Sequence, residues 1–413
     1  MKSIFGAGAA LAFSLAASAG STLYQHGRIA TGTGPVLDDA SVLIVDGRIR
    51  GIGREISAPA GAEVIDLHGR WVTPALFGGI GSMGVVEVSA ERTTNDGGLN
   101  LGNVRPEFDP ALAFNPDSLP IQIARVEGVG FALLAPEPGT HASGGNVIDG
   151  LADVVTLDGN APRGPSALVV EMGREGASLA GDNRAASFLL LSDAFEEARH
   201  PPRAGEPRRL TDAGRATLQQ VLSGRMPVLF KVDRAADIRA VLRFSSQQKL
   251  RAIIAGGAEA WRVGKDLAAA HVPVVIDPLE ALPADFDRIA TTLENAARLE
   301  HAGVTVAFSL RSNAPHEARK LRQAAGNAVA HGMSWEKAFC AITQVPAAAF
   351  GAAPLGTLTG GEKAHLVVWS GDPLNVTSLV EAQWLDGEPQ RLTSRQTALR
   401  DRYLDKLRRG EAR

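Results

Sequence analysis

The sequence Trp71-Val72-Thr73-Pro74-Ala75-Leu76-Phe77-Gly78-Gly79-Ile80-Gly81-Ser82 carries the strongest indication of the architecture of this chain. Its second half is a short apolar run of the kind that forms a strand buried on both faces. Alternate residues of a strand point to the same side, so Ile80 and Ser82 are expected to project together near its carboxyl end. Neither is a normal metal ligand, because isoleucine has no donor atom and serine is a poor substitute for imidazole.

Short apolar runs alternate with helical stretches through the middle of the chain, which predicts an α/β fold with a parallel sheet. Eight runs can be counted: Leu76 to Ser82, Gly130 to Ala135, Val154 to Leu157, Ala167 to Glu171, Pro227 to Val232, Ala252 to Ala255, Pro273 to Ile276 and Val304 to Phe308. The span from about residue 75 to residue 351 therefore fits a TIM (β/α)8 barrel, which typically has about 250 residues.

The entry segment resembles the opening of the barrel in the amidohydrolase superfamily, specifically its imidazolonepropionase-like branch, where this strand runs Pro-Gly-Leu-Ile-Asp-X-His-X-His. Further similarities lie in Gly256 to Trp261, Ile342 to Ala347 and Gly360 to Trp369. The resemblance implies hydrolysis of a non-peptide carbon-nitrogen bond, in a cyclic or small amide, by metal-activated water. It also implies a small β-sandwich built from both chain ends, which we assign to residues 20–74 and 352–393, with the barrel at 75–351.

The resemblance places the metal ligands of that family on Ile80, Ser82, Lys231, Gly256 and Arg311. None of these residues forms a normal zinc site. We therefore expect no cofactor, and a pseudoenzyme that serves as a ligand-binding or partner subunit. The alternative is an active amidohydrolase with rearranged or metal-independent chemistry, and zinc or another divalent metal is expected under this alternative only.

Charged residues near the predicted strand ends suggest two arrangements. Lys231 and Arg311 either attract an anionic small-molecule ligand or pair with Glu259 or Asp277 in an internal salt-bridge network, which is the favoured interpretation. Two loop histidines are candidates for general acid or base chemistry near neutral pH. The candidate pocket residues are Ser82, His141, Lys231, Asp233, Glu259, Asp277, Arg311 and His316.

The amino-terminal residues are typical of a secretory signal peptide. Met1-Lys2 is followed by an apolar run, and Ala17-Ser18-Ala19 is a small-X-small cleavage pattern, so residues 1–19 are expected to be removed. We expect a secreted or periplasmic protein without a membrane span, because no segment has the required length. The net charge of −3 gives no basic footprint, so we expect no nucleic-acid partner.

The last segment, residues 394–413, is predicted to be a charged helical tail. Leu399, Tyr403 and Leu407 recur at helical spacing, so this helix is expected to pack on the outside of the molecule. A partner-binding role for the helix is the alternative. An active amidohydrolase paralogue is the expected protein partner, and a homo-oligomer is an open alternative.

Overall fold

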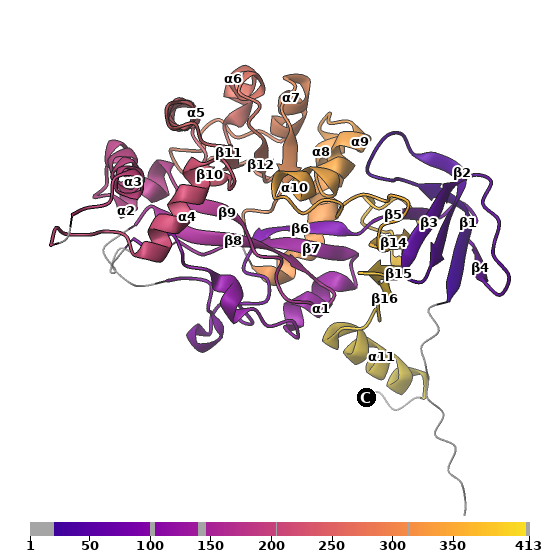
Figure 1. Ribbon diagram of the computed structural model, residues 1–413. Helices are drawn as coiled ribbons and strands as arrows, with labels where there is room; N and C mark the ends of the chain where they lie inside the picture. Colours follow the sequence, from indigo (N-terminus) through magenta and orange to yellow (C-terminus); the bar gives the residue numbers. More distant parts are fainter. Residues whose placement is uncertain (1–19, 100–103, 139–145, 204, 313, 410–413) are drawn as a thin grey trace, which may run out of the picture.

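The computed structural model describes residues 20–99, 104–138, 146–203, 205–312 and 314–409. These residues form a barrel of strands and helices with a separate β-sheet domain at one end, on the right in Figure 1. The predicted fold class, a TIM (β/α)8 barrel with a small β-sandwich built from both chain ends, is confirmed as a TIM-type barrel with a separate β-sheet domain.

The barrel wall is an eight-stranded sheet in the order β13-β12-β11-β10-β9-β8-β7-β6. The apolar runs became strands because both of their faces are buried, and all six residues of β7 are buried. Its strands are β6 (Leu76–Gly81), β7 (Val129–Leu134), β8 (Ile148–Thr156), β9 (Pro165–Glu171), β10 (Val228–Val232), β11 (Ala252–Gly256), β12 (Val274–Ile276) and β13 (Val306–Phe308).

One barrel strand runs against the others. Strand β8 pairs antiparallel with both β7 and β9, whereas the remaining pairs in this sheet are parallel. The sequence predicted a fully parallel wall, and this part of the expectation is wrong. Because β8 is reversed, its first residues rather than its last lie at the end of the barrel where the parallel strands finish.

The barrel is closed by a side chain instead of a strand ladder. Among the described residues, no strand pairing joins β6 to β13. The hydroxyl of Ser309, which follows β13, accepts a hydrogen bond from the backbone N–H of Ile80 at 2.8 Å and lies 3.5 Å from the Ile80 carbonyl oxygen. Gly79 (φ +91°) allows this approach, since a Cβ there would lie 3.0 Å from the Ser309 hydroxyl oxygen.

Helices surround the barrel and complete its hydrophobic core, which the strands and the inner faces of the helices share. They are α1 (Leu119–Arg125), α2 (Gly173–Leu179), α3 (Arg184–Arg199), α4 (Asp212–Leu222), α5 (Ala235–Gln248), α6 (Gly264–Ala269), α7 (Asn295–His301), α8 (Leu321–Ala330), α9 (Trp335–Cys340) and α10 (Gln344–Ala349). Within the described ranges, no helix combines the length and apolar character needed to cross a membrane.

The second domain is a sheet to which both chain ends contribute. Its order is β16-β15-β14-β5-β1-β2-β3, with β4 paired to β1, and it has a separate apolar core. The strands are β1 (Ser21–Ile29), β2 (Leu37–Val45), β3 (Arg48–Gly53), β4 (Glu63–Asp66), β5 (Trp71–Pro74), β14 (Leu366–Trp369), β15 (Val380–Leu385) and β16 (Glu388–Pro389). The two ends meet where β5 pairs antiparallel with β14, and the buried indole of Trp369 donates a hydrogen bond to the Thr73 hydroxyl at 2.9 Å.

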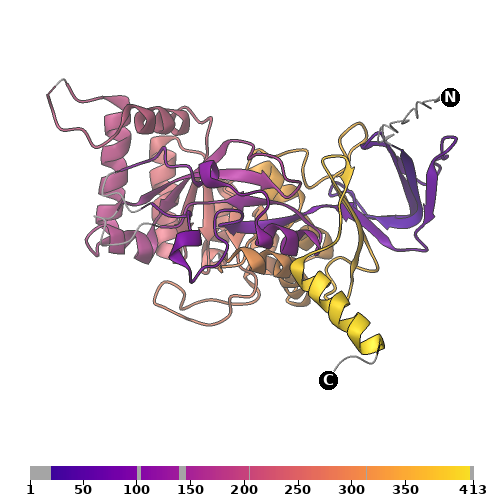
Figure 2. The same ribbon diagram turned by 90° about the horizontal axis from the view of Figure 1, so that it is seen from below.

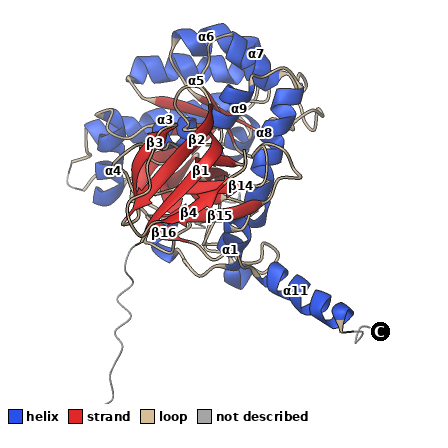
Figure 3. Cartoon of the chain, turned by 90° about the vertical axis from the view of Figure 1, so that its right-hand side faces the viewer, coloured by secondary structure: helices blue, strands red, loops and turns tan. Residues whose placement is uncertain are grey.

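The predicted tail helix is present as α11 (Arg395–Arg408), but it is not packed along its length. It begins with a capping box at Ser394, contacts α1, and then extends away from the body of the protein (Figures 2 and 3). None of its residues is buried. The expectation of a docked helix is therefore wrong, because its apolar stripe faces solvent.

Candidate active site at the barrel mouth

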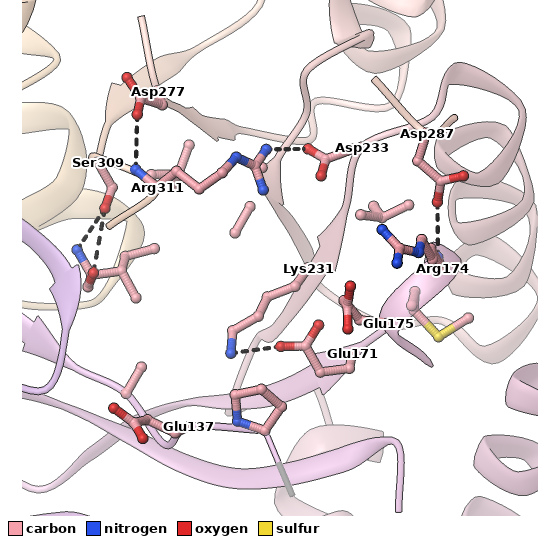
Figure 4. A pocket seen from close by; sticks show the side chains of 18 of the residues that line it. Glu137, Glu171, Arg174, Glu175, Lys231, Asp233, Asp277, Asp287, Ser309 and Arg311 are labelled. Atoms are coloured by element: carbon pink, nitrogen blue, oxygen red, sulfur yellow. Dashed lines mark hydrogen bonds and ion pairs between the residues drawn. The ribbon is translucent and has the colours of Figure 1, made fainter. Parts of the chain in front are cut away.

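A cavity of about 400 Å³ opens where the parallel strands of the barrel end. This is the end at which TIM-type barrels place their chemistry. Its wall includes the last residues of β6, β9, β10 and β11, the first turn of α2, and the segment that follows β12 (Figure 4). The cavity is large enough for a small molecule.

On one side of the cavity, Lys231 of β10 is held between two carboxylates. Its Nζ lies 2.7 Å from Glu171 Oε1 and 3.2 Å from Asp149 Oδ2, and it also donates to the Pro136 carbonyl oxygen at 3.4 Å. Burial opposes charging of the amine, but the two carboxylates hold the pKa of Lys231 above its usual value. Burial, with repulsion from Glu171, raises the pKa of Asp149 despite the attraction of Lys231.

On the opposite side, Arg311 is likewise shared by two carboxylates. Its guanidinium donates to Asp233 Oδ1 at 2.8 Å and to Glu280 Oε2 at 2.7 Å. Burial opposes the charge, yet these carboxylates hold the pKa of Arg311 above its usual value. Asp277, which the sequence suggested as a partner of this cation, instead accepts a hydrogen bond from the backbone N–H of Arg311 at 2.9 Å.

The segment 278–294, between β12 and α7, forms part of the cavity rim and is anchored by acidic side chains. Asp287 is buried and accepts hydrogen bonds from the backbone N–H of Arg174 at 2.8 Å and from the Arg184 guanidinium. Asp285 pairs with Arg288, and hydrogen bonds from Arg288 hold the pKa of Asp285 below its usual value. Arg288 also binds Glu280 at 2.8 Å, so one chain of ion pairs connects this rim to Arg311.

The cavity wall has a glycine, Gly256, at the end of β11, and the surrounding geometry leaves no room for a side chain there. Its φ is +93°, and a Cβ would lie 2.6 Å from Asp233 Oδ1. A larger residue would both strain the backbone and displace the carboxylate that binds Arg311.

Four of the predicted site residues line the cavity: Lys231, Asp233, Asp277 and Arg311. The remaining candidate pocket residues either do not line the cavity or lie outside the described residues. Ser82 is 2% exposed and lines a small adjacent void instead of the main cavity. His141 lies outside the described residues. His316 is exposed, lies near Glu317 at 3.5 Å and is not part of the cavity wall.

Glu259 is another candidate pocket residue that does not line the cavity. It is buried away from the cavity, and its carboxylate accepts backbone N–H groups of Ala235 and Ala290, each at 3.1 Å. It therefore fixes the start of α5 and the rim segment, and it pairs with neither Lys231 nor Arg311.

Sequence reasoning missed several acidic residues of the site. Glu171 is the last residue of a strand that was predicted correctly, so its place at the carboxyl end was a usable signal. Asp149 is the second residue of β8 and reaches the mouth only because that strand is reversed. The acidic residues of the rim lie in a long connection without a periodic pattern, namely Glu280, Asp285 and Asp287.

The charges that line the cavity are mainly negative. The carboxylates among its described residues are Glu137, Glu171, Glu175, Asp233, Asp277, Asp285 and Asp287, whereas the basic groups are Arg174, Lys231, Arg288 and Arg311. Each basic group already lies within ion-pair distance of a carboxylate. A ligand in this cavity therefore meets an excess of hydrogen-bond acceptors and negative charge.

Comparisons with solved structures support the fold. An amidohydrolase from Thermotoga maritima MSB8 superposes with a TM-score of 0.79 at 24% identity, covering 90% of this chain and 99% of that one. A zinc-bound adenosine deaminase from Xanthomonas campestris superposes with a TM-score of 0.51 at 15% identity, covering 94% and 98%. Amidohydrolase tasK from Hapsidospora irregularis is 26% identical over 344 residues, which is 71% of this chain but only 34% of that protein.

These relatives correct the prediction that no cofactor is involved. Proteins of this superfamily are typically metal-dependent, and the deaminase neighbour contains zinc, so the expectation of no cofactor is wrong. The described residues do not by themselves form a metal cage, since no group of three or more His, Cys, Asp and Glu side chains among them is arranged to hold an ion. Glu171 and Asp233 are each engaged by a basic side chain, so we assign no chemical step to a metal.

The family comparison agrees with the architecture. Residues 252–395, which run from β11 through the last barrel helices to the start of α11, match the model of the amidohydrolase family. The imidazolonepropionase-like branch stays a prediction. Together, the matched segment and the superposed barrel with its appended sheet show that this chain has the fold of the amidohydrolase superfamily and resembles its sequences over residues 252–395.

Proposed function

We propose that the cavity at the barrel mouth binds a small amide that carries a positively charged amino group, and that it serves the reaction class of the superfamily, hydrolysis of a non-peptide carbon-nitrogen bond. The observation that supports this is the excess of carboxylates over basic groups in the cavity wall. A cation gains from such a lining, whereas an anion is repelled by it.

The basis for an anionic ligand is weaker than the sequence suggested. That expectation required Lys231 and Arg311 to be available cations, but each bridges two carboxylates. This arrangement supports the internal salt-bridge network, which the sequence analysis favoured over an anionic ligand.

Two carboxylates are placed to receive the ligand. Asp277 lies at the end of β12 and Glu175 lies in the first turn of α2, and neither forms an ion pair with any described residue. The two oxygens of Asp277 accept the backbone N–H groups of Leu279 and Arg311, which fixes the position of this carboxylate in the cavity wall. A carboxylate oxygen has more than one acceptor position, so a ligand ammonium can bind there as well.

A matched series of ligands tests the charge preference. 6-Aminohexanamide, hexanamide and adipamic acid share an amide and a chain of similar length, and end in a cation, a methyl group and an anion. Calorimetry at low salt should show at least about tenfold tighter binding of the amine than of the acid, equivalent to about 1.4 kcal/mol. Equal binding of all three, or a preference for the acid, would reject the proposal.

Release of ammonia from the same compounds tests the reaction. The assay should be run with and without added zinc, because zinc is what a structural neighbour contains. Asp277→Asn and Glu175→Gln should reduce the preference for the amine, whereas Glu336→Gln, an exposed change on α9, should not. Binding without turnover under either condition would support a ligand-binding subunit over an enzyme.

Export and a protein partner are further parts of the proposal. Export is supported by the sequence of residues 1–19, which lie outside the described residues, and the amino-terminal sequence of protein recovered from a periplasmic or culture fraction would test it. A role as a subunit of an active paralogue is tested by co-purification, with the paralogue's turnover measured in the presence and absence of this chain.

A further inference from the structure

Helix α11 exposes an apolar stripe that nothing in the described structure covers. The side chains of Leu399, Tyr403, Leu404 and Leu407 belong to residues that are 40%, 59%, 41% and 62% exposed. The helix extends away from the barrel and the sheet domain, so this stripe is accessible from outside (Figure 3). Exposed apolar residues at this density are typical of a surface that contacts another phase or molecule.

The apolar residues lie on one face of the helix. Successive residues are rotated by about 100°, so Leu399, Tyr403 and Leu407 form a row and Leu404 lies at its edge. The acidic residues Asp401 and Asp405 fall on the opposite face.

The basic residues lie beside the apolar row. Arg395, Arg402 and Lys406 fall along one edge of it, and none of them forms an ion pair with another described residue. The Lys406 ammonium lies 5.7 Å from the centroid of the Tyr403 ring, so the charge is held next to the apolar row. Arg400, at the other edge, pairs with Asp401 at 2.8 Å.

We propose that α11 binds to an anionic phospholipid surface, with the apolar row inserted at the boundary of the acyl chains and the basic edge near the headgroup phosphates. An apolar row beside basic residues, with acidic residues on the far side, is the arrangement by which amphipathic helices lie in a membrane interface. The cation edge is attracted by anionic headgroups, and the acidic face is turned toward water.

The same charges disfavour a second copy of α11 as the occupant. The helix carries Arg395, Arg400, Arg402, Lys406 and Arg408 but only Asp401 and Asp405 as acidic residues, so two such helices in contact repel each other. An anionic surface has no such conflict.

Sedimentation with vesicles tests this proposal on the full chain. Vesicles of phosphatidylcholine with about one third phosphatidylglycerol are compared with vesicles of phosphatidylcholine alone. The triple variant L399S/Y403S/L407S removes the apolar row, and L112S changes a leucine that is 90% exposed elsewhere on the surface. All forms contain the same residues 1–19, so a difference between the variants belongs to α11.

The unchanged chain and L112S should bind the anionic vesicles equally, and the triple variant should bind them at least tenfold more weakly. No α11 residue is buried, so the triple variant should keep the melting temperature of the unchanged chain, which separates lost binding from lost folding. Equal binding by the triple variant, or equal binding to the neutral vesicles, would overturn the proposal. Loss of a dimer or of a bound protein, without loss of vesicle binding, would assign the helix to that partner and would overturn it too. This inference does not depend on the ligand proposed for the cavity.

Discussion

The ammonium of Lys231 lies 2.7 Å from the carboxylate of Glu171, and the same ammonium lies 3.2 Å from Asp149. The three residues come from adjacent strands, because β8, β9 and β10 lie side by side in the barrel wall. The chain thus places two buried acidic groups against a single base at the cavity.

Replacing Lys231 by methionine should destabilise the protein strongly. Methionine retains most of the apolar length of the lysine side chain but removes the ammonium that binds the buried Glu171 and Asp149, and breaking a buried ion pair in this way typically costs about 3–5 kcal/mol. The free energy of unfolding from urea titration at pH 7 measures this. Lys363→Met, which breaks an exposed pair with Asp386, is the matched control and should cost less than about 1 kcal/mol. Similar losses for the two variants would contradict the central role of the buried pair.

Asp153→Asn should stabilise the protein at high pH and have little effect at low pH. Burial, followed by the proximity of Asp109, raises the pKa of Asp153 to about 7 from a usual value of 3.8. A carboxyl group with a raised pKa favours the folded state while it is protonated, so this contribution is complete below about pH 4 and is lost as pH rises toward 7.

The full pKa difference for Asp153 corresponds to about 4 kcal/mol, and partial solvent screening reduces it, so we expect a gain on the order of 2 kcal/mol at pH 8. Thermal or urea unfolding of both forms between pH 4 and pH 8 would show it. A constant difference between the two forms across this range would rule out titration of Asp153 as the cause.

Gly256→Ala should be more destabilising than Gly224→Ala. Both glycines have a positive φ, +93° and +75°, so both substitutions incur the backbone strain of a non-glycine residue, roughly 1–2 kcal/mol. Only at position 256 does the new Cβ meet another group, the Asp233 carboxylate at 2.6 Å. The difference in the free energy of unfolding between the two variants isolates this contact, and equal values would show that the carboxylate moves away freely.

Asp287→Ala should loosen the rim of the cavity. The buried carboxylate accepts the Arg174 N–H and pairs with Arg184, so its removal leaves the Arg174 N–H without its acceptor and leaves Arg184 paired with Asp237 alone. Hydrogen exchange followed by mass spectrometry should show faster exchange in segment 278–294. Asp266→Ala breaks an exposed pair with Arg239 and should leave that segment unchanged. Unaltered exchange in the Asp287 variant would mean that other contacts anchor the rim.

The sequence predicted the barrel well because its strands are buried on both faces and therefore read as continuous apolar runs. Strand direction was not predictable in the same way. The run Val154 to Leu157 predicted that a strand exists here. Its antiparallel direction depends on how it pairs with β7 and β9, and the apolar pattern of one strand does not contain that information. For the same reason, the sequence did not predict that Asp149 lies at the mouth of the barrel.

The site was predicted in part because strand ends can be located and side-chain partners cannot. Four candidate residues lie near the carboxyl ends of apolar runs, and all four line the cavity: Lys231, Asp233, Asp277 and Arg311. Glu259 also follows such a run, but its side chain turns to the backbone N–H groups of Ala235 and Ala290. The periodicity of α11 was read correctly, whereas its exposure depends on whether a complementary surface is folded beneath it, which periodicity does not encode.

The Ser309 hydroxyl has a mechanical consequence for the barrel. Where neighbouring strands elsewhere in the wall share ladders of backbone hydrogen bonds, the described contact between β6 and the end of β13 depends on this one side chain and the backbone of Ile80. We therefore expect the barrel wall to deform most easily between β6 and β13. If the mouth of the barrel widens, we expect β6 and β13 to separate before the strands that share backbone hydrogen bonds. Those hydrogen-bonded strands would then move as rigid bodies.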